Sequence, residues 1–181
     1  MILNSELVRE SFFRVGGTVS VKDYLGQFGQ YGTLIISRYP CRFFEMQFKS
    51  DMGRSLLCAE PQFPMNLVIA TSHYESESSA YSDIRKQQLR DTFKLIKAAE
   101  KDTHKSHCII AGDFNFDLIR GKKEMDIVKD SGFKDILDEL WPKETRTMNA
   151  RGKFKGWRPD KVVIWDNKEN DGDKYWKITK A

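Results

Sequence analysis

Short runs of apolar residues, each bounded by turn-forming residues, alternate along the chain with stretches that have helical spacing. The apolar runs predict strands over residues 33–37, 55–60, 67–72, 108–112 and 161–165. Two of them, LVIATS and CIIAG, are almost continuously apolar, which is typical of strands buried on both faces. Strands come first, and a helix, a strand, a helix and a strand follow. This order predicts an α/β sandwich with helices packed outside the sheets.

The segment 81–102, between the two most apolar runs, has the pattern of an amphipathic helix. Its arginines and lysines fall on one side, and the other side carries Ile84, Leu89, Phe93 and Ile96. A shorter helix is predicted over 122–130, ending near Gly132. We find no internal repeat and no linker, so we expect one domain over 1–181.

Composition narrows the class of protein only slightly. Hydrophobic residues make up 40% of the 181 positions and charged residues 31%, as in ordinary globular domains. No apolar segment approaches the roughly 20 residues that span a bilayer, so we expect an intracellular protein, nuclear or cytoplasmic, without a membrane partner. The three cysteines lack CxxC spacing, which argues against a disulfide framework and against a zinc site. The net charge of +4 permits an anionic partner without requiring one.

Polar residues follow two of the buried runs at the points where the chain leaves the sheet, a common place for reactive groups. His73 and Glu75 follow LVIATS, and Asp113 and Asn115 follow the glycine of CIIAG. In an extended segment Asp113 and Asn115 project to the same face, where a carboxylate and an amide could hold a hard cation or activate a water. The alternatives are an exposed loop histidine and an Asx turn in which Asp113 bonds only its own backbone.

A basic segment with aromatic residues precedes the last predicted strand. It includes Lys153, Lys155, Trp157 and Arg158, a combination that suits a phosphate backbone with stackable bases. The alternative is a solvated basic hairpin with a packed tryptophan. Asp160 is a lone acid entering an apolar strand, and acids in such places usually orient a partner, often a histidine.

Three segments in this order, TSHYES, AGDFNF and RPDKVV, resemble the endonuclease/exonuclease/phosphatase superfamily, the metal-dependent phosphodiesterases related to DNase I. YGTLIISRYP resembles the strand and turn that precede the active site in this superfamily. SAYSDIRKQQLRDTF and GRSLLCAE are similar to segments of its 5′-tyrosyl-DNA phosphodiesterase branch. The resemblance extends from about Asn4 to Trp165.

The resemblance implies an α/β, four-layer DNase I-like sandwich of two mixed sheets. It also implies that Asp113 activates the attacking water, Asn115 binds the scissile phosphate and His73 contacts a phosphoryl oxygen. Asp160 would orient a second histidine. The metal would be Mg²⁺, with Mn²⁺ as an alternative, held by Asp113 and Asn115. The substrate would be nucleic acid, in particular DNA 5′ ends, protein-linked ends included, as in DNA repair. The residues expected to contact it are Arg85, Lys153, Lys155, Trp157 and Arg158.

The sequence also departs from the superfamily pattern. No Gln-Glu precedes Ser37 and no Ser-Asp-His ends the chain, so we expect a domain that lacks its first strands and its last strand, with a weak magnesium site. Glu75 or Asp117 are then alternative metal ligands. Other functions stay open at this stage: RNA deadenylase, abasic endonuclease, inositol phosphatase, or an inactive paralogue that binds nucleic acid or protein. The oligomeric state is open as well.

Overall fold

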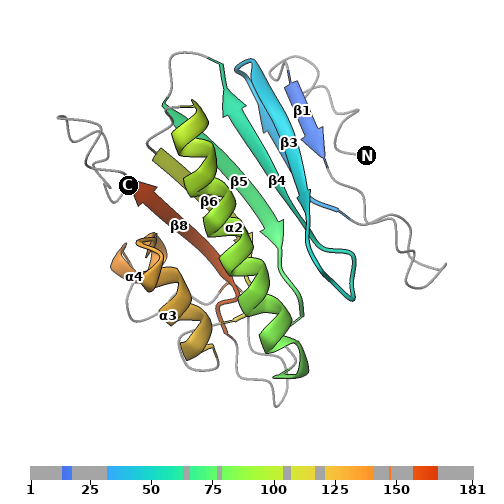
Figure 1. Ribbon diagram of the computed structural model, residues 1–181, viewed down its shortest axis with the longest axis vertical. Helices are drawn as coiled ribbons and strands as arrows, with labels where there is room; N and C mark the ends of the chain where they lie inside the picture. Colours follow the sequence, from blue (N-terminus) through green and yellow to red (C-terminus); the bar gives the residue numbers. More distant parts are fainter. Residues whose placement is uncertain are drawn as a thin grey trace.

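The computed structural model describes residues 14–17, 32–62, 66–76, 79–103, 107–116, 121–140, 147 and 157–166 (Figure 1). A two-stranded sheet contains β1 (Arg14–Gly17) and β2 (Leu34–Ser37). A six-stranded mixed sheet contains β3 (Cys41–Gln47), β4 (Ser55–Pro61), β5 (Leu67–His73), β6 (His107–Asp113), β7 (Lys134–Asp135) and β8 (Asp160–Asp166). The helices are the short 3₁₀ helix η2 (Ser79–Tyr81), α2 (Ser82–Thr103), α3 (Lys122–Asp130) and α4 (Ile136–Leu140).

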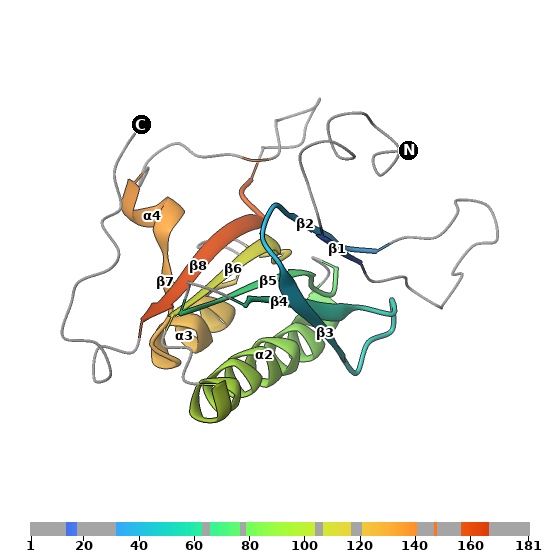
Figure 2. The same ribbon diagram turned by 90° about the horizontal axis from the view of Figure 1, so that it is seen from above.

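The elements form layers. Helices α2 and α3 cover one face of the six-stranded sheet, and β1 and β2 lie over the opposite face, against β4 (Figure 2). The strand order is β3-β4-β5-β6-β8-β7, in which β5 and β6 are parallel and every other pair is antiparallel. The predicted α/β class is therefore confirmed. Within the described ranges, no helix is both long enough and apolar enough to cross a membrane.

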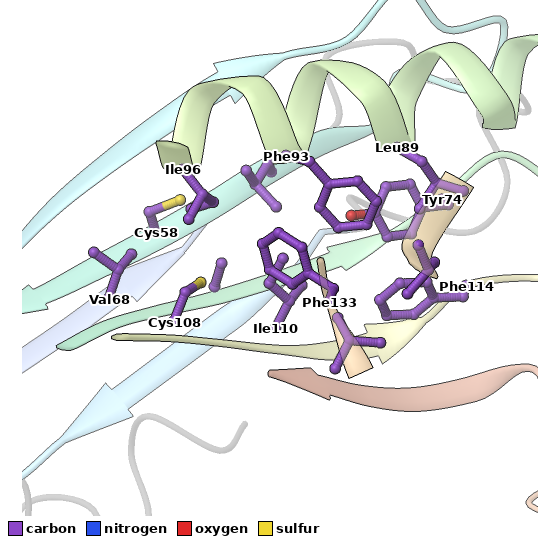
Figure 3. Close-up of a cluster of buried hydrophobic side chains, with 14 of the residues drawn as sticks. Cys58, Val68, Tyr74, Leu89, Phe93, Ile96, Cys108, Ile110, Phe114 and Phe133 are labelled. Carbon is purple, nitrogen blue, oxygen red and sulfur yellow. The ribbon is translucent and has the colours of Figure 1, made fainter. Parts of the chain in front are cut away.

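The main core lies between α2 and the six-stranded sheet (Figure 3). The helix contributes Leu89, Phe93 and Ile96, all almost completely buried. The ring of Phe93 stacks on that of Phe133, with 4.3 Å between centroids. The sheet contributes Cys58, Val68, Cys108 and Ile110. Burying a large apolar side chain stabilises a fold by about 1.5–3 kcal/mol, so this layer holds the central strands rigidly in place.

The predicted elements are confirmed to within a residue or two at their ends. The helix predicted over 81–102 is α2, and the one predicted over 122–130 is α3, which is followed by Gly132 with φ of 79°. Each predicted strand is present. Strands β1, β3 and β7 and helix α4 were not predicted from the sequence.

Candidate active site

Four neighbouring strands of the large sheet begin or end at one edge (Figure 1). Because β5 and β6 are parallel, their last residues, His73 and Asp113, are direct partners in the register. Because β4 and β8 run the opposite way, they begin where β5 and β6 end. Arg54 therefore precedes β4 at this edge, and Asp160, the first residue of β8, pairs with Asp113. The fold thus gathers residues from distant segments, as the sequence analysis expected for His73, Asp113 and Asp160.

A glycine allows β5 and β6 to approach closely just before the site. Gly112 pairs with Ser72, and a Cβ at position 112 would collide with the backbone carbonyl oxygen of Ser72. A side chain there would push the two strands apart. Since His73 and Asp113 are the next residue pair, Gly112 controls how close their side chains come.

The His73 imidazole and the Asp113 carboxylate face each other, with 3.4 Å between Nε2 and Oδ2. Burial, and then the charge of Arg54, lowers the pKa of His73 to about 4, and Asp160 acts in the opposite direction. His73 is therefore neutral at physiological pH. A neutral imidazole can still donate one hydrogen bond to an oxygen that gains charge.

The carboxyl group of Asp113 has a raised pKa. Burial is the main cause, the backbone hydrogen bond from Asn115 opposes it, and the nearby carboxylate of Asp160 adds to it. A carboxylate with a raised pKa is a stronger base at neutral pH. About 29% of the Asp113 side chain is exposed, so a water molecule can reach it. These properties are those expected of a general base.

Asn115 does not continue the strand, so the prediction that Asp113 and Asn115 share one face of an extended segment is wrong. The strand ends at Asp113, and Asn115 adopts a left-handed conformation with φ of 54°, which asparagine tolerates better than most residues. Its backbone N–H donates to Oδ1 of Asp113 at 2.9 Å, so the Asx turn considered above is present. Its amide Nδ2 donates to the carbonyl oxygen of Tyr74 at 2.9 Å, which fixes the amide next to the end of β5. The turn therefore places Asn115 at the site by a different route from the one predicted.

Arg54 belongs to the site but was missed by the sequence analysis. It precedes β4 opposite the end of β5, and its charge acts to lower the pKa of both His73 and Asp113. It is mostly buried, and burial lowers its pKa while the charges of Glu75 and Asp113 oppose that shift. The one signal in the sequence was an arginine immediately before a buried strand, in the segment GRSLLCAE.

Glu75, considered above as an alternative metal ligand, does not face the site as an open ligand. It is 0% exposed, and its two side-chain oxygens accept hydrogen bonds from Ser50, Met52 and Gln88. The other alternative ligand, Asp117, lies outside the described residues.

The structure places Arg85, predicted to contact substrate, in the interior. Its side chain is 3% exposed, and Nη2 lies 2.9 Å from Oε1 of Glu124. It also donates to the backbone carbonyl of Ser76, and Ser82 donates to the same oxygen of Glu124. Arg85 thus joins α2, α3 and the segment after β5.

Two further predicted substrate contacts, Trp157 and Arg158, are also buried. Arg158 pairs with Asp135 at 3.3 Å and with Asp138, which ties the start of β8 to β7 and α4. The neighbouring Lys161 is 1% exposed and lies 3.4 Å from Asp135 and 4.9 Å from the centre of the Phe116 ring. This buried group of charges fixes β8 and therefore Asp160. Lys153 and Lys155 lie outside the described residues.

The oxygen donors of the site suit a hard cation. Among the residues that the structure describes, no three His, Cys, Asp or Glu side chains form a metal cluster. Mg²⁺, however, needs only one or two carboxylates and keeps several waters. Asp113 and Asp160 supply two carboxylates and Asn115 an amide oxygen. Burial is the main cause of the raised pKa of Asp113 and the charge of Asp160 adds to it, and a cation would relieve that repulsion between the carboxylates. The predicted magnesium site therefore fits the residues present.

Solved structures of the endonuclease/exonuclease/phosphatase class share this fold. The endonuclease/exonuclease/phosphatase of Beutenbergia cavernae DSM 12333 matches with a TM-score of 0.72 and 17% identity, over 88% of this chain and 48% of that chain. The resemblance and the DNase I-like fold predicted from the sequence are confirmed at the level of the fold.

Particular enzymes within this class match as well. D. rerio TDP2 complexed with single strand DNA product matches with a TM-score of 0.61 and 21% identity, over 93% of this chain and 66% of that chain. The human Nocturnin catalytic domain with bound sulfate matches with a TM-score of 0.59 and 16% identity, over 90% of this chain and 63% of that chain. The chain thus spans between 48% and 66% of the length of these three structures. No family model matches the sequence, and no curated protein sequence matches it significantly.

Proposed function

We propose that this chain is a metal-dependent phosphodiesterase that acts on nucleic acid, of the 5′-tyrosyl-DNA phosphodiesterase type. The proposal rests on one observation: His73, Asp113 and Asp160 lie together at one edge of this sheet, with Asn115 beside them. These are the residues that the superfamily motifs single out. The likeness to D. rerio TDP2, which was solved with a single strand DNA product, supports nucleic acid as the substrate.

In the proposed reaction, water attacks the phosphorus that links a tyrosine to a DNA 5′ end. Asp113 takes the proton of the water, a new P–O bond forms, and the bond to the tyrosine oxygen breaks, which leaves a 5′-phosphate. Asp113 is the carboxylate that we assign to accept that proton, because it ends β6 beside His73 and part of its side chain is exposed to water. Negative charge grows on the phosphoryl oxygens, and the neutral His73 and the positive Arg54 would stabilise it.

Asn115 would position the phosphate through its amide, whose orientation is fixed by the bond to Tyr74. Asp113 and Asn115 would also hold Mg²⁺, or Mn²⁺ in its place, and Asp160 lies close enough to contribute its carboxylate. When bound, the metal would neutralise phosphate charge and lower the pKa of the attacking water. Asp160 also remains the candidate to orient a histidine.

We assign binding of the nucleic-acid backbone to the basic segment that contains Lys153 and Lys155. Lysines in such a segment neutralise phosphates and release counterions from the nucleic acid. Trp157 and Arg158 are buried and would support this segment rather than touch the substrate through an exposed face.

The test is cleavage of a 5′-phosphotyrosyl oligonucleotide by the purified chain with Mg²⁺, with an EDTA control and Asp113→Asn as the matched inactive variant. Metal-dependent release of tyrosine and a 5′-phosphate would support the proposal. A parallel set of substrates separates the alternatives: an adenylated RNA tail, an abasic duplex and an inositol phosphate. Binding of DNA without cleavage of any of these would favour the non-enzymatic alternative.

A further inference from the structure

The side chain of Glu75 bonds to a turn that lies far from it in the sequence. Oε2 accepts a hydrogen bond from Oγ of Ser50 at 2.6 Å, and Oε1 accepts one from the backbone N–H of Met52 at 3.0 Å. Both donors lie in the turn between β3 and β4. Glu75 itself follows the end of β5, two residues after His73. A completely buried carboxyl group therefore joins this turn to the site.

The same turn carries the backbone of Arg54. Oγ of Ser50 accepts the backbone N–H of Arg54 at 2.8 Å and that of Met52 at 3.1 Å. The turn is closed by a backbone bond of 3.2 Å from the N–H of Phe48 to the carbonyl oxygen of Arg54. Ser50 is thus the link between Glu75 and Arg54: it donates to the first and accepts from the second.

Helix α2 holds the other side of Glu75. Nε2 of Gln88 donates to Oε2 of Glu75 at 3.0 Å, and Oε1 of Gln88 accepts the backbone N–H of Glu75 at 2.9 Å. Gln88 is 1% exposed and lies on the rigid face of α2 that covers the sheet. The network therefore runs from α2 through Glu75 and Ser50 to the Arg54 backbone. Buried polar networks in which every bond is made restrict their members to one arrangement.

We propose that Glu75 is a positioning residue for Arg54: through Ser50 it fixes the backbone of the arginine, which precedes β4 beside the end of β5 that carries His73. The inference rests on the proposed function, because it assigns a role to Arg54 in the same site. An arginine side chain has several rotatable bonds, and a charge displaced by about 1 Å can cost up to about 100-fold in rate. Fixing the backbone removes part of that freedom before substrate binds.

Glu75→Gln tests this role with little change in size. The amide keeps one oxygen but turns an NH₂ group towards donors, so at least one bond to Ser50, Met52 or Gln88 is lost. The matched control is Glu124→Gln, the same change at an equally buried carboxyl group that pairs with Arg85 instead. Both variants lose a buried carboxylate, but the control leaves the Arg54 turn intact.

The first readout is hydrogen exchange of the Arg54 backbone amide, measured by NMR on the intact chain without substrate. We expect exchange to accelerate at least about tenfold in Glu75→Gln relative to Glu124→Gln, because the bond to Ser50 loosens. Equal exchange in the two variants would overturn the proposal. This measurement needs no activity, so it decides the positioning role even if the chain cleaves none of the substrates.

The second readout is a double-mutant cycle on the cleavage rate. We expect Glu75→Gln to lower kcat by about 10- to 100-fold with little change in KM, and to have no further effect in the Arg54→Ala background. Glu124→Gln should lower the melting temperature without this loss of kcat. If Glu75→Gln reduces kcat by the same factor with and without Arg54, Glu75 does not act through the arginine. If the proposed function itself is wrong, the unmodified protein cleaves none of the substrates, and this outcome is distinct from every result of the mutant cycle.

Discussion

Asp113 ends β6 beside His73, and its Oδ2 lies 3.4 Å from Nε2 of the imidazole, while its other oxygen accepts the backbone N–H of Asn115. On the opposite side it pairs in register with Asp160. A single carboxylate is therefore held between a neutral imidazole and a second acid, with one oxygen committed to the backbone. One oxygen of Asp113 therefore closes the turn that ends the strand, and the other is left for the role of base that we propose.

Replacing Asp113 with asparagine should remove cleavage and keep the fold. The change is isosteric, and it relieves the repulsion from Asp160, so the melting temperature should stay the same or rise. Loss of the base should lower kcat by about 10²–10⁴-fold. Rates on the tyrosyl oligonucleotide and a thermal melt check both effects. If Asp113→Asn cleaves the substrate at the wild-type rate, Asp113 is not the base and only forms the turn.

His73 should make the protein less stable in mild acid. Its pKa is about 4 in the folded protein and ordinarily 6.5, so the unfolded chain takes up a proton first as the pH falls. The free energy of unfolding should therefore decrease from pH 6.5 towards pH 4, and this part of the decrease should disappear in His73→Gln. Urea unfolding at pH 7 and pH 5 measures the difference. An identical pH dependence in both proteins would contradict the lowered pKa.

Arg85→Met should reduce stability rather than substrate binding. Removing the arginine leaves Glu124 buried without its charged partner, which typically costs about 3–5 kcal/mol. The double variant Arg85→Met/Glu124→Leu should recover part of that loss. Urea unfolding gives the stability and fluorescence anisotropy the affinity for single-stranded DNA. If Arg85→Met is as stable as the unmodified protein but binds single-stranded DNA more weakly, Arg85 contacts the substrate, as predicted from the sequence.

Only one of the three cysteines should react quickly in the native protein. Cys58 and Cys108 are buried in the core, and burial raises the pKa of Cys58 to about 12 and that of Cys108 well above its ordinary value. Cys41 is partly exposed. A disulfide reagent should titrate one thiol in buffer and three in denaturant, and none quickly in Cys41→Ser. Fast reaction of three native thiols would mean that the core between α2 and the sheet is not formed.

Lys153 and Lys155 should contribute to the salt dependence of DNA binding. Replacing both with alanine should reduce the slope of log K against log salt by up to about 2, since each phosphate contact releases about one counterion. The matched control replaces Lys94 and Lys97, two exposed lysines of α2. Anisotropy titrations at several salt concentrations give the slopes. If the slope is the same in the Lys153/Lys155 variant and in the Lys94/Lys97 variant, the basic segment does not bind the nucleic-acid backbone and is ordinary solvated surface.

The elements that the sequence analysis predicted correctly are those whose apolar pattern reports their burial. Leu89, Phe93 and Ile96 repeat at helical spacing because they face one sheet, and the alternate residues of β5 and β6 that pack against α2 are buried. The residues between them are only half-buried, so the continuous apolar runs predicted more burial of these two strands than the structure shows. Strand β3 was missed because it is an edge strand. Its charged residues, Arg42 and Glu45, are exposed and interrupt the apolar pattern.

The candidate site was predictable only where a motif marks it. His73 and Asp113 end recognisable strands and Asp160 begins one. The turn at Asn115 and the place of Arg54 depend instead on neighbours distant in the sequence. Lys161 shows the same limit. It follows the basic segment directly in the sequence, yet it is buried, because its ammonium group lies against Asp135 and the Phe116 ring. Pairing across the sheet cannot be read from local composition.

The place of β6 in the middle of the sheet has a consequence for how the protein folds. One of its neighbours, β5, precedes α2 in the chain, and the other, β8, follows α3 and α4. Contacts between distant segments slow folding, because long loops must close before the contacts form. No short fragment of the chain contains the candidate site, so a ribosome-bound chain gains it only after β8 has emerged and paired with β6. Until that moment Asp113 would have His73 beside it but no Asp160.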